Sequence, residues 1–578
     1  MKRAFISMML VGAAVAGLAS CTSDVAPERT SERELFVRAI TEPGTRTSLS
    51  GDDETGYDVL WQAQDEISID GKTFRLQSGE GTKDGVFQLV SGTAPASGTY
   101  TAYYPASYTG SGWVNEQTFV ADNITGSPMV AEAAVSGTDI SDLHFTNVGG
   151  ILRLTVKGSS DIKVKSVVVT ATELASAITL TCAAPVQLNT TSGVQFHVSM
   201  PAEGYSNLSI CFKDNDGKAI DTKTLKSGKL VVKRSTITKA SFEIHRSTSL
   251  RVATFNVDGL PVSLNVGSLI AKFIKNNVSG IKVDDDNNVY INETGPGVEG
   301  SKALSAGIDA KDWDVFGMNE DFNYHKEVWS CLGDYSQGTY QGGFEASGLE
   351  YVALVVKALA QKPLFSIDGL EFGVKKACCT MSGEKIVSWN SNAVYGYFTN
   401  DNDGLTKKGF RYYKVTVNKD GIKAQVDFII LHADAGDAAE DIKARENGFA
   451  QLLDFVKNLK STDPLIMMGD WNSRYYRDDF KALFIDKLNA IEGISVRDSW
   501  VECNNGGKYP EYAGSADRGP SSAAGHEELD KILFLNRDDA TVALEVVSEG
   551  NVVDFTDDNG KQLSDHYPAE AEFRLIVK

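Results

Sequence analysis

The stretch Leu465-Ile466-Met467-Met468-Gly469-Asp470-Trp471-Asn472, near the C-terminal end of the chain, decides how the fold is interpreted. Its four consecutive apolar residues predict a buried strand. Gly469 then frees the backbone, and the strand ends on a carboxylate, an indole and a carboxamide. If strand geometry continues, Asp470 and Asn472 point to the same side. An ordinary turn would use the same residue types, so the remaining strand ends must distinguish a functional site from a turn.

Length and charge limit the classes of protein to consider. With 578 residues the chain is too long for one hydrophobic core, which predicts several domains. Hydrophobic residues make up 42% and charged residues 23%, as in globular proteins rather than disordered ones. The net charge is −21, and residues 251–578, with 34 basic and 51 acidic side chains, contribute −17 of it. This balance argues against a general nucleic-acid binder, which carries a basic face.

The first residues have the pattern of a targeting segment. Lys2 and Arg3 precede a short apolar run at residues 4–18. The end of the segment, Leu18-Ala19-Ser20-Cys21, resembles the lipobox of bacterial lipoproteins. The resemblance implies a lipoprotein signal peptide at residues 1–21 and an exported chain anchored to a membrane by acylated Cys21. We expect the outer membrane, on its periplasmic or its surface face. An ordinary signal peptide followed by a chance cysteine is the alternative.

The next part of the chain predicts a tether and an all-β region. Residues 22–34 are polar and predict the tether. Short alternating runs from 35 to 245, separated by Gly, Ser, Asn and Asp, predict strands. Five motifs stand out among these runs: Thr45–Leu49, Val59–Gln62, Asp65–Ile67, Tyr103–Pro105 and Phe145–Gly150. With them the region resembles the fimbrillin-like domains of Bacteroidetes lipoproteins, which implies a β-sandwich region, alone or as two subdomains dividing near residue 150.

After a short polar joint at 245–249 the pattern changes to mixed strands and helices. We expect strands at Leu250–Val257 and Asp314–Met318, and helices at 266–277, 302–310 and 444–460. Such alternation favours an α/β or α+β domain in which helices cover sheets. Each later strand ends on polar residues. In chain order these are Asn256, Asp258, Glu320, His432, Asp470, Asn472, Asp530, Asp565 and His566.

These residue types suit one kind of chemistry. Carboxylates, carboxamides and two histidines, with no cysteine among them, fit a hard cation such as Mg²⁺ together with acid-base catalysis. The order Asn, Glu, His, Asp-x-Asn, Asp, Asp-His resembles the endonuclease/exonuclease/phosphatase superfamily. The resemblance covers residues 250–578 and implies the DNase I-like fold, an α/β four-layer sandwich. Glu320–His325, Gly404–Phe410 and the acidic loop after His432 are similar to the sphingomyelinase-like branch.

The resemblance also implies a role for each site residue. Glu320, helped by Asn256 and Asp565, would hold Mg²⁺ or Mn²⁺. The implied catalytic residues are His566 as the base, Asp530 to orient its ring, His432 as a donor to the phosphate, and Asp470 and Asn472 to position nucleophile and phosphate. Nearby basic residues are expected to form a solvated strand face. They are Lys407, Lys408, Arg411 and Lys414.

The sequence therefore predicts a metal-dependent phosphodiesterase on a lipid-anchored β-sandwich stalk. The expected substrate is a small phosphodiester or a phospholipid head group. One alternative is an extracytoplasmic nuclease acting on DNA, since Asn256–Leu260 is similar to the apurinic endonucleases. The charge of −17 over residues 251–578 weighs against it. The other alternative is an adhesin or pilus-related subunit with an inactive C-terminal domain, against which the complete ordered set of polar residues argues.

Overall fold

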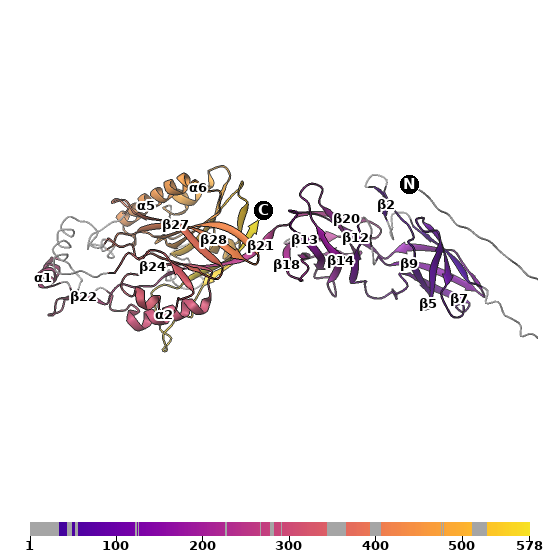
Figure 1. Ribbon diagram of the computed structural model, residues 1–578, viewed down its shortest axis with the longest axis horizontal. Helices are drawn as coiled ribbons and strands as arrows, with labels where there is room; N and C mark the ends of the chain where they lie inside the picture. Colours follow the sequence, from indigo (N-terminus) through magenta and orange to yellow (C-terminus); the bar gives the residue numbers. More distant parts are fainter. Residues whose placement is uncertain are drawn as a thin grey trace, which may run out of the picture. The chain divides into compact units, whose positions relative to one another are not determined.

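The computed structural model (Figure 1) describes most of the chain. The described residues are 34–42, 49–52, 56–121, 124, 127–225, 228–265, 267–277, 282–290, 292–343, 366–393, 406–475, 477, 479–510 and 529–578. The predicted signal peptide, Cys21 and nearly all of the tether lie outside them. Within the described residues, no helix has the length and apolar content needed to cross a bilayer.

The chain divides into two compact units. The first comprises residues 1–152 with 197–204 and 231–238, and the second comprises 153–196, 205–230 and 239–578. The domain boundaries drawn from the sequence stay predictions. Among the described residues of 34–245, strands occur without helices, as the alternating pattern predicted.

The first sheet closes on itself. Its order is β10-β9-β11-β1-β6-β5-β4-β7, and β7 pairs again with β9. Closure pairs the strand edges that would otherwise be open to other chains. The strands are β1 (Phe36–Thr41), β4 (Glu66–Ile69), β5 (Lys72–Ser78), β6 (Asp84–Leu89), β7 (Gly98–Tyr104), β9 (Met129–Ser136), β10 (Asp139–Ile140) and β11 (Leu143–Asn147).

The core of this ring explains three of the sequence motifs. Trp61 is fully buried and packs edge-on against Phe87, Tyr104 and Phe145. Its indole N–H donates to the carbonyl of Ala39 at 3.0 Å, which satisfies the polar atom that burial would otherwise leave unpaired. Three of the quoted motifs, Val59–Gln62, Tyr103–Pro105 and Phe145–Gly150, therefore each supply an aromatic side chain to the same core.

Before residue 245 there are also two two-stranded sheets, β2 (Leu49–Asp52) with β3 (Gly56–Val59) and β16 (Gly204–Tyr205) with β19 (Leu230–Val231), and two larger sheets. One has the order β15-β12-β20 and the other β18-β17-β13-β14-β8. Their strands are β8 (Glu116–Phe119), β12 (Gly149–Lys157), β13 (Lys163–Thr170), β14 (Ile178–Gln187), β15 (Val194–Pro201), β17 (Ser209–Lys213), β18 (Ala219–Thr224) and β20 (Ile237–Glu243).

The C-terminal part is built on two six-stranded sheets. The first has the order β25-β26-β24-β21-β34-β33 and the second β27-β28-β29-β30-β32-β31. The first contains β21 (Arg246–Asn256), β24 (Val315–Asn319), β25 (Tyr335–Gln337), β26 (Glu371–Lys375), β33 (Val542–Asn551) and β34 (Ala569–Val577). The second contains β27 (Cys379–Ser388), β28 (Gly409–Lys419), β29 (Ile422–His432), β30 (Leu465–Asp470), β31 (Ile494–Asp498) and β32 (Asp530–Arg537).

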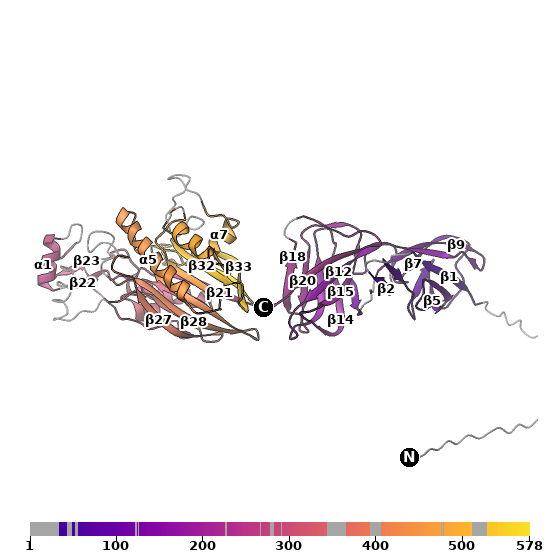
Figure 2. The ribbon, with the colours of Figure 1, turned by 90° about the horizontal axis from the view of Figure 1, so that it is seen from above.

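Alternation along these strands produces the layers. Val252, Phe428 and Met468 lie in a core shared by both sheets. Their strand neighbours face outward, where α2 (Gly297–Lys311) covers the first sheet and α5 (Ala439–Asn458) covers the second. Figure 1 shows α2 on one side of the strands and α5 on the other, and Figure 2 shows α5 lying over β27 and β28.

The shorter elements of this part are arranged around the two sheets. They are β22 (Ser263–Asn265), α1 (Ser268–Asn277), β23 (Asn288–Tyr290), α3 (His325–Val328), the π-helical turn η1 (Lys481–Ile485), α6 (Asp486–Asn489) and α7 (Ser499–Asn504).

Two expectations need correction. The segment 245–249 is not a joint, because residues from Arg246 onward belong to β21 and pair with β34 up to Val577. Helix α5 begins five residues before the predicted position. Its first turn is acidic and Asp441 accepts from the backbone N–H of Ala438 at 2.9 Å. Apolar periodicity marks only the buried middle of a helix, so it misses a polar first turn.

Candidate active site

The polar strand ends continue the inner, sheet-facing positions of their strands. On β30 the buried series Ile466 and Met468 leads to Asp470, and on β29 Phe428 and Ile430 lead to His432. Asp470 is register-paired with His432 on one side and with Asp530 of β32 on the other. The site therefore forms where the core between the two sheets ends.

Gly469 allows this approach. Its φ is +141°, and a Cβ at this position would lie 2.0 Å from the carbonyl oxygen of Leu431. Only glycine tolerates both conditions. Asn472, by contrast, does not continue the strand. Its φ is +48°, its backbone N–H donates to Asp470 Oδ1 at 2.9 Å, and its Nδ2 donates to the carbonyl of Ala433 at 3.1 Å.

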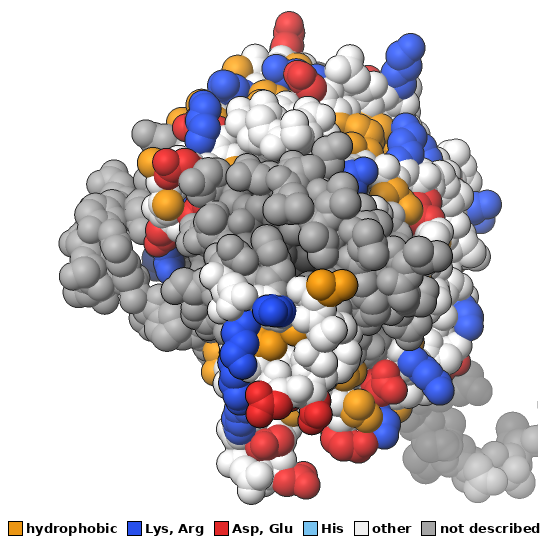
Figure 3. Space-filling model, turned by 90° about the vertical axis from the view of Figure 1, so that its left-hand side faces the viewer, with side chains coloured by type: hydrophobic (Ala, Val, Ile, Leu, Met, Phe, Trp, Pro, Cys, Tyr) orange, Lys and Arg blue, Asp and Glu red, His pale blue; other side chains and the backbone are white. Residues whose placement is uncertain are grey.

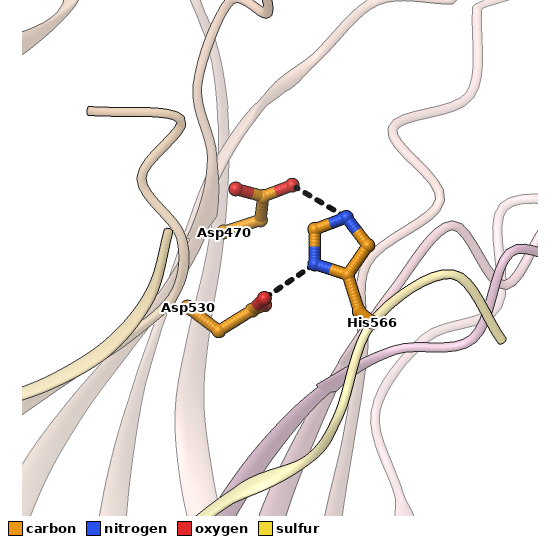
Figure 4. A group of neighbouring side chains, drawn as sticks. All are labelled: Asp470, Asp530 and His566. Carbon is orange, nitrogen blue, oxygen red and sulfur yellow. Dashed lines mark hydrogen bonds and ion pairs between the residues drawn. The ribbon is translucent and has the colours of Figure 1, made fainter. Parts of the chain in front are cut away.

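His566 lies between two carboxylates, as Figure 4 shows. Its Nδ1 is 2.5 Å from Asp530 Oδ2, and its Nε2 is 4.0 Å from Asp470 Oδ2. Burial alone would lower the pKa of His566, but the surrounding carboxylates, Asp530 foremost, outweigh burial and raise this pKa well above its usual range. Asp530 fixes one ring nitrogen, which leaves Nε2 facing the site.

Asn256 connects the two sheets at the site. Its Nδ2 donates to Glu320 Oε1 at 3.1 Å and to Asp470 Oδ2 at 3.3 Å. Glu320 follows β24 in a left-handed conformation with φ of +62°. Gly259 makes room for this turn, because a Cβ there would lie 2.3 Å from the carbonyl oxygen of Glu320. Burial raises the pKa of Glu320 to about 7, Lys408 opposes this shift, and Asp565 adds to it.

His432 is fully enclosed and faces the same carboxylates. Its Nε2 lies 3.6 Å from Asp470 Oδ2 and 3.8 Å from Glu320 Oε1. Burial, reinforced by the positive charge of Lys408, lowers the pKa of His432 well below its ordinary value. Of the two histidines, His432 therefore stays neutral, whereas the carboxylates around His566 stabilise its protonated form.

Lys408 belongs to the site, which sequence reasoning missed. It was expected on a solvated strand face, but it is 6% exposed and its Nζ donates to the carbonyl of Ala433 at 3.2 Å. Arg411 is also buried, in a bidentate pair with Asp368, whereas Lys407 is exposed as expected. Alternation at the start of a strand does not reveal which charged residues have buried partners. The signal in the sequence was the similarity of Gly404–Phe410, which contains Lys408, to the sphingomyelinase-like branch.

Two further residues support the site from loops. Ser564 Oγ donates to the carbonyl of Asn256 at 2.7 Å and accepts from the backbone N–H of His566 at 3.1 Å. It ties the end of β21 to the loop that carries the histidine. Asp258 accepts from Asn292 Nδ2 at 2.5 Å, and burial, then the charges of Asp565 and Glu320, raise its pKa to about 7.

The predicted metal ligands are brought only partly together. Asn256 and Glu320 are in contact, whereas the side chain of Asp565 is 69% exposed and 3.9 Å from His566 Nε2. Asp470, Asp530 and His566 form a compact group whose ligand atoms all lie within 4.8 Å of one another. The carboxylates of Asp470, Asp530 and Glu320 outnumber the lysine of the site, Lys408, so negative charge is in excess there. The donor set is oxygen-rich and fits a hard divalent cation.

Comparison with known proteins points in the same direction. No protein-family model matches the sequence. The chain is 30% identical over 182 residues to sphingomyelinases of Mycobacterium bovis and Mycobacterium tuberculosis, over 31% of this chain and 33% of theirs. It thus spans about a third of the length of the curated relatives it matches.

Two solved structures align with 56–57% of the chain. Beta toxin from Staphylococcus aureus is 19% identical, with 99% of its chain covered and a TM-score of 0.32. An endonuclease/exonuclease/phosphatase family protein from Bacteroides thetaiotaomicron is 14% identical, with 98% covered and a TM-score of 0.32.

Proposed function

We propose that this chain is a hydrolase of phosphoric ester bonds, specifically a divalent-metal-dependent phosphodiesterase. The observation that carries the proposal is the placement of His566. Its Nδ1 is held by Asp530 at 2.5 Å while its Nε2 faces Asp470, at the end of a core that also delivers Glu320 and Asn256. The two facing sheets with helices outside them support the DNase I-like, four-layer arrangement.

In this reaction water attacks phosphorus, the bond from phosphorus to the ester oxygen breaks, and that oxygen leaves as an alcohol beside a phosphomonoester. His566 in its neutral form takes the proton of the attacking water at Nε2, and Asp530 stabilises the imidazolium so formed at Nδ1. Release of that proton to the leaving oxygen through solvent restores the neutral base. Asp470 orients the water, and Lys408 and neutral His432 interact with the phosphate as charge builds. Glu320, Asn256 and Asp565 would hold Mg²⁺ or Mn²⁺, which supplies polarisation of a phosphoryl oxygen and offsets the local negative charge.

We propose a compact phosphodiester, such as a phospholipid head group, as the substrate. The sphingomyelinase similarity supports this choice. So does the charge of −17 over residues 251–578, because duplex binding relies on neutralising many phosphates. On the described part of the face in Figure 3, basic side chains lie among acidic, apolar and uncharged ones.

The anchor and the first half complete the proposal. We propose that Cys21 is acylated, that the chain is held at the outer membrane, and that the β-rich half is a fimbrillin-like spacer or adhesive module. The lipobox-like end of the first segment and the closed strand ring with its buried Trp61 support these assignments.

The test is a side-by-side rate measurement on the purified full chain with and without Mg²⁺. Sphingomyelin, phosphatidylinositol-type lipids, bis-p-nitrophenyl phosphate and plasmid DNA are compared at physiological salt. We expect lipid and small-diester turnover that His566→Ala abolishes. Rapid DNA nicking without lipid turnover would show instead that the chain is a nuclease. Absence of any metal-dependent turnover would favour an adhesin or pilus-related subunit with an inactive C-terminal domain.

A further inference from the structure

The backbone around His432, and not its ring, holds this histidine in place. Among the described residues, His432 Nδ1 has no hydrogen-bond partner, and Nε2 faces carboxylates 3.6 and 3.8 Å away. The carbonyl of His432 accepts from Trp389 Nε1 at 2.7 Å, and the backbone N–H of Ala433 donates to the carbonyl of Asp470 at 2.9 Å. The backbone on either side of Ala433 therefore helps to set where the imidazole lies.

Beyond Ala433 the chain leaves the sheet, and Arg445 is one of the side chains that hold it. Arg445, on α5, donates through Nη1 to the carbonyl of Asp434 at 3.0 Å and to that of Gly436 at 2.7 Å. The guanidinium comes from a helix packed on the outer face of the sheet, whereas the catalytic histidine points to the inner face. Arg445 thus restrains the loop from behind, without contact with the reacting groups.

The same guanidinium reaches the turn that carries Asn472. Arg445 Nε donates to Asp479 Oδ2 at 3.0 Å, and Asp479 Oδ1 accepts from the hydroxyl of Ser473. Ser473 directly follows Asn472, whose Nδ2 returns to the carbonyl of Ala433 at 3.1 Å. The contacts form a closed circuit through both loops. Arg445, Asp479 and Ser473 are each no more than 1% exposed.

We propose that the buried Arg445–Asp479 pair is a positioning device that sets His432 and Asn472 relative to each other. The role in the reaction rests on the proposed phosphodiesterase function. A guanidinium is suited to it, because its planar fork meets two loop carbonyls and a carboxylate in fixed directions, whereas a lysine ammonium is a single point charge. A misplacement of about 1 Å in such a site lowers a rate about a hundredfold.

The test uses full-length Arg445→Ala, Arg445→Lys and Asp479→Asn with bis-p-nitrophenyl phosphate and Mg²⁺. We expect kcat of Arg445→Ala to fall about a hundredfold, with KM nearly unchanged because the substrate does not touch Arg445. Added guanidinium ion should restore much of the kcat of Arg445→Ala. Arg445→Lys keeps the charge but should remain slow. The control is Arg497→Ala, whose exposed pair with Glu502 touches neither loop.

Several results would overturn the proposal. A lower melting temperature with unchanged kcat, or guanidinium that restores the melting temperature alone, makes Arg445 purely structural. If Arg445→Ala does not fold, Asp479→Asn decides, because it keeps the side-chain shape while removing the charge. If wild type hydrolyses no phosphodiester, the proposed function fails separately. In that case the positioning role is tested by the imidazole NMR signals of His432, which are assigned by their absence in His432→Gln. If these signals are unchanged in Arg445→Ala and Asp479→Asn, the positioning role is rejected.

Discussion

His432 and Asp470 occupy register-paired positions at the ends of the parallel strands β29 and β30, with His432 Nε2 3.6 Å from Asp470 Oδ2. Because parallel strands place their carboxyl ends at the same edge, this pairing puts a neutral imidazole and a carboxylate at one point of the site. Asp530 extends the row on the next strand.

His566 and Asp530 should act as one unit. We expect His566→Ala and Asp530→Asn each to lower kcat by about 10²- to 10⁴-fold, the range for general acid-base groups. The double variant should be no slower than the worse single variant, because the two side chains share one function. Steady-state rates on bis-p-nitrophenyl phosphate measure this. A double loss equal to the product of two large single losses would show that the contact is not functional.

Glu320 should govern the response to metal. In wild type, Mg²⁺ or Mn²⁺ should raise the melting temperature, because a ligand that binds only the folded state stabilises it by mass action. Glu320→Gln should lose this increase along with most of the activity, while its melting temperature in chelator stays near or above that of wild type, since a buried charge is removed. Glu299→Gln, an exposed acid on α2, is the matched control. Full wild-type activity in excess chelator would contradict the prediction.

Lys408 should matter where its neighbour Lys407 does not. Lys408→Met removes the positive charge that opposes the raised pKa of Glu320 and depresses that of His432. We expect kcat/KM to fall at least about tenfold, a loss of about 1.4 kcal/mol in transition-state stabilisation, and the acid limb of the rate profile to move to higher pH. Lys407→Met changes an exposed side chain and should behave as wild type. Equal effects of the two substitutions would show that Lys408 has no specific role in the site.

Burial of neutral His432 should make stability depend on pH. The pKa of His432 is lowered in the folded state, so the unfolded chain binds the proton that the folded chain excludes. Its contribution is therefore fully present above the unfolded pKa of about 6.5 and is lost as the pH falls below that value. The limiting slope is about 1.4 kcal/mol per pH unit. Denaturant unfolding between pH 5 and 8 checks this: the slope of the unfolding free energy against pH should be lower in His432→Gln than in wild type, by up to about 1.4 kcal/mol per pH unit, whereas exposed His144→Gln should match wild type.

The sequence by itself determined the strand Leu465–Asp470 and the polar residues at the later strand ends. Four buried apolar residues followed by Gly469 leave few alternatives, because a central strand is apolar on both faces. The all-β character of residues 34–245 and the helices around 268–277 and 439–458 were also predictable, since periodicity reports which faces are buried. Their ends were not, because polar first turns carry no periodic signal.

Only the tertiary structure decided which polar groups meet and which are buried. Asn256 bridges Glu320 and Asp470, which are 150 residues apart in the chain, because the two sheets face each other there. Lys408 and Arg445 look like surface residues in the sequence, yet each is buried with carbonyl partners from another segment. Burial of a charge depends on partners that only the folded chain supplies, and no local pattern records them.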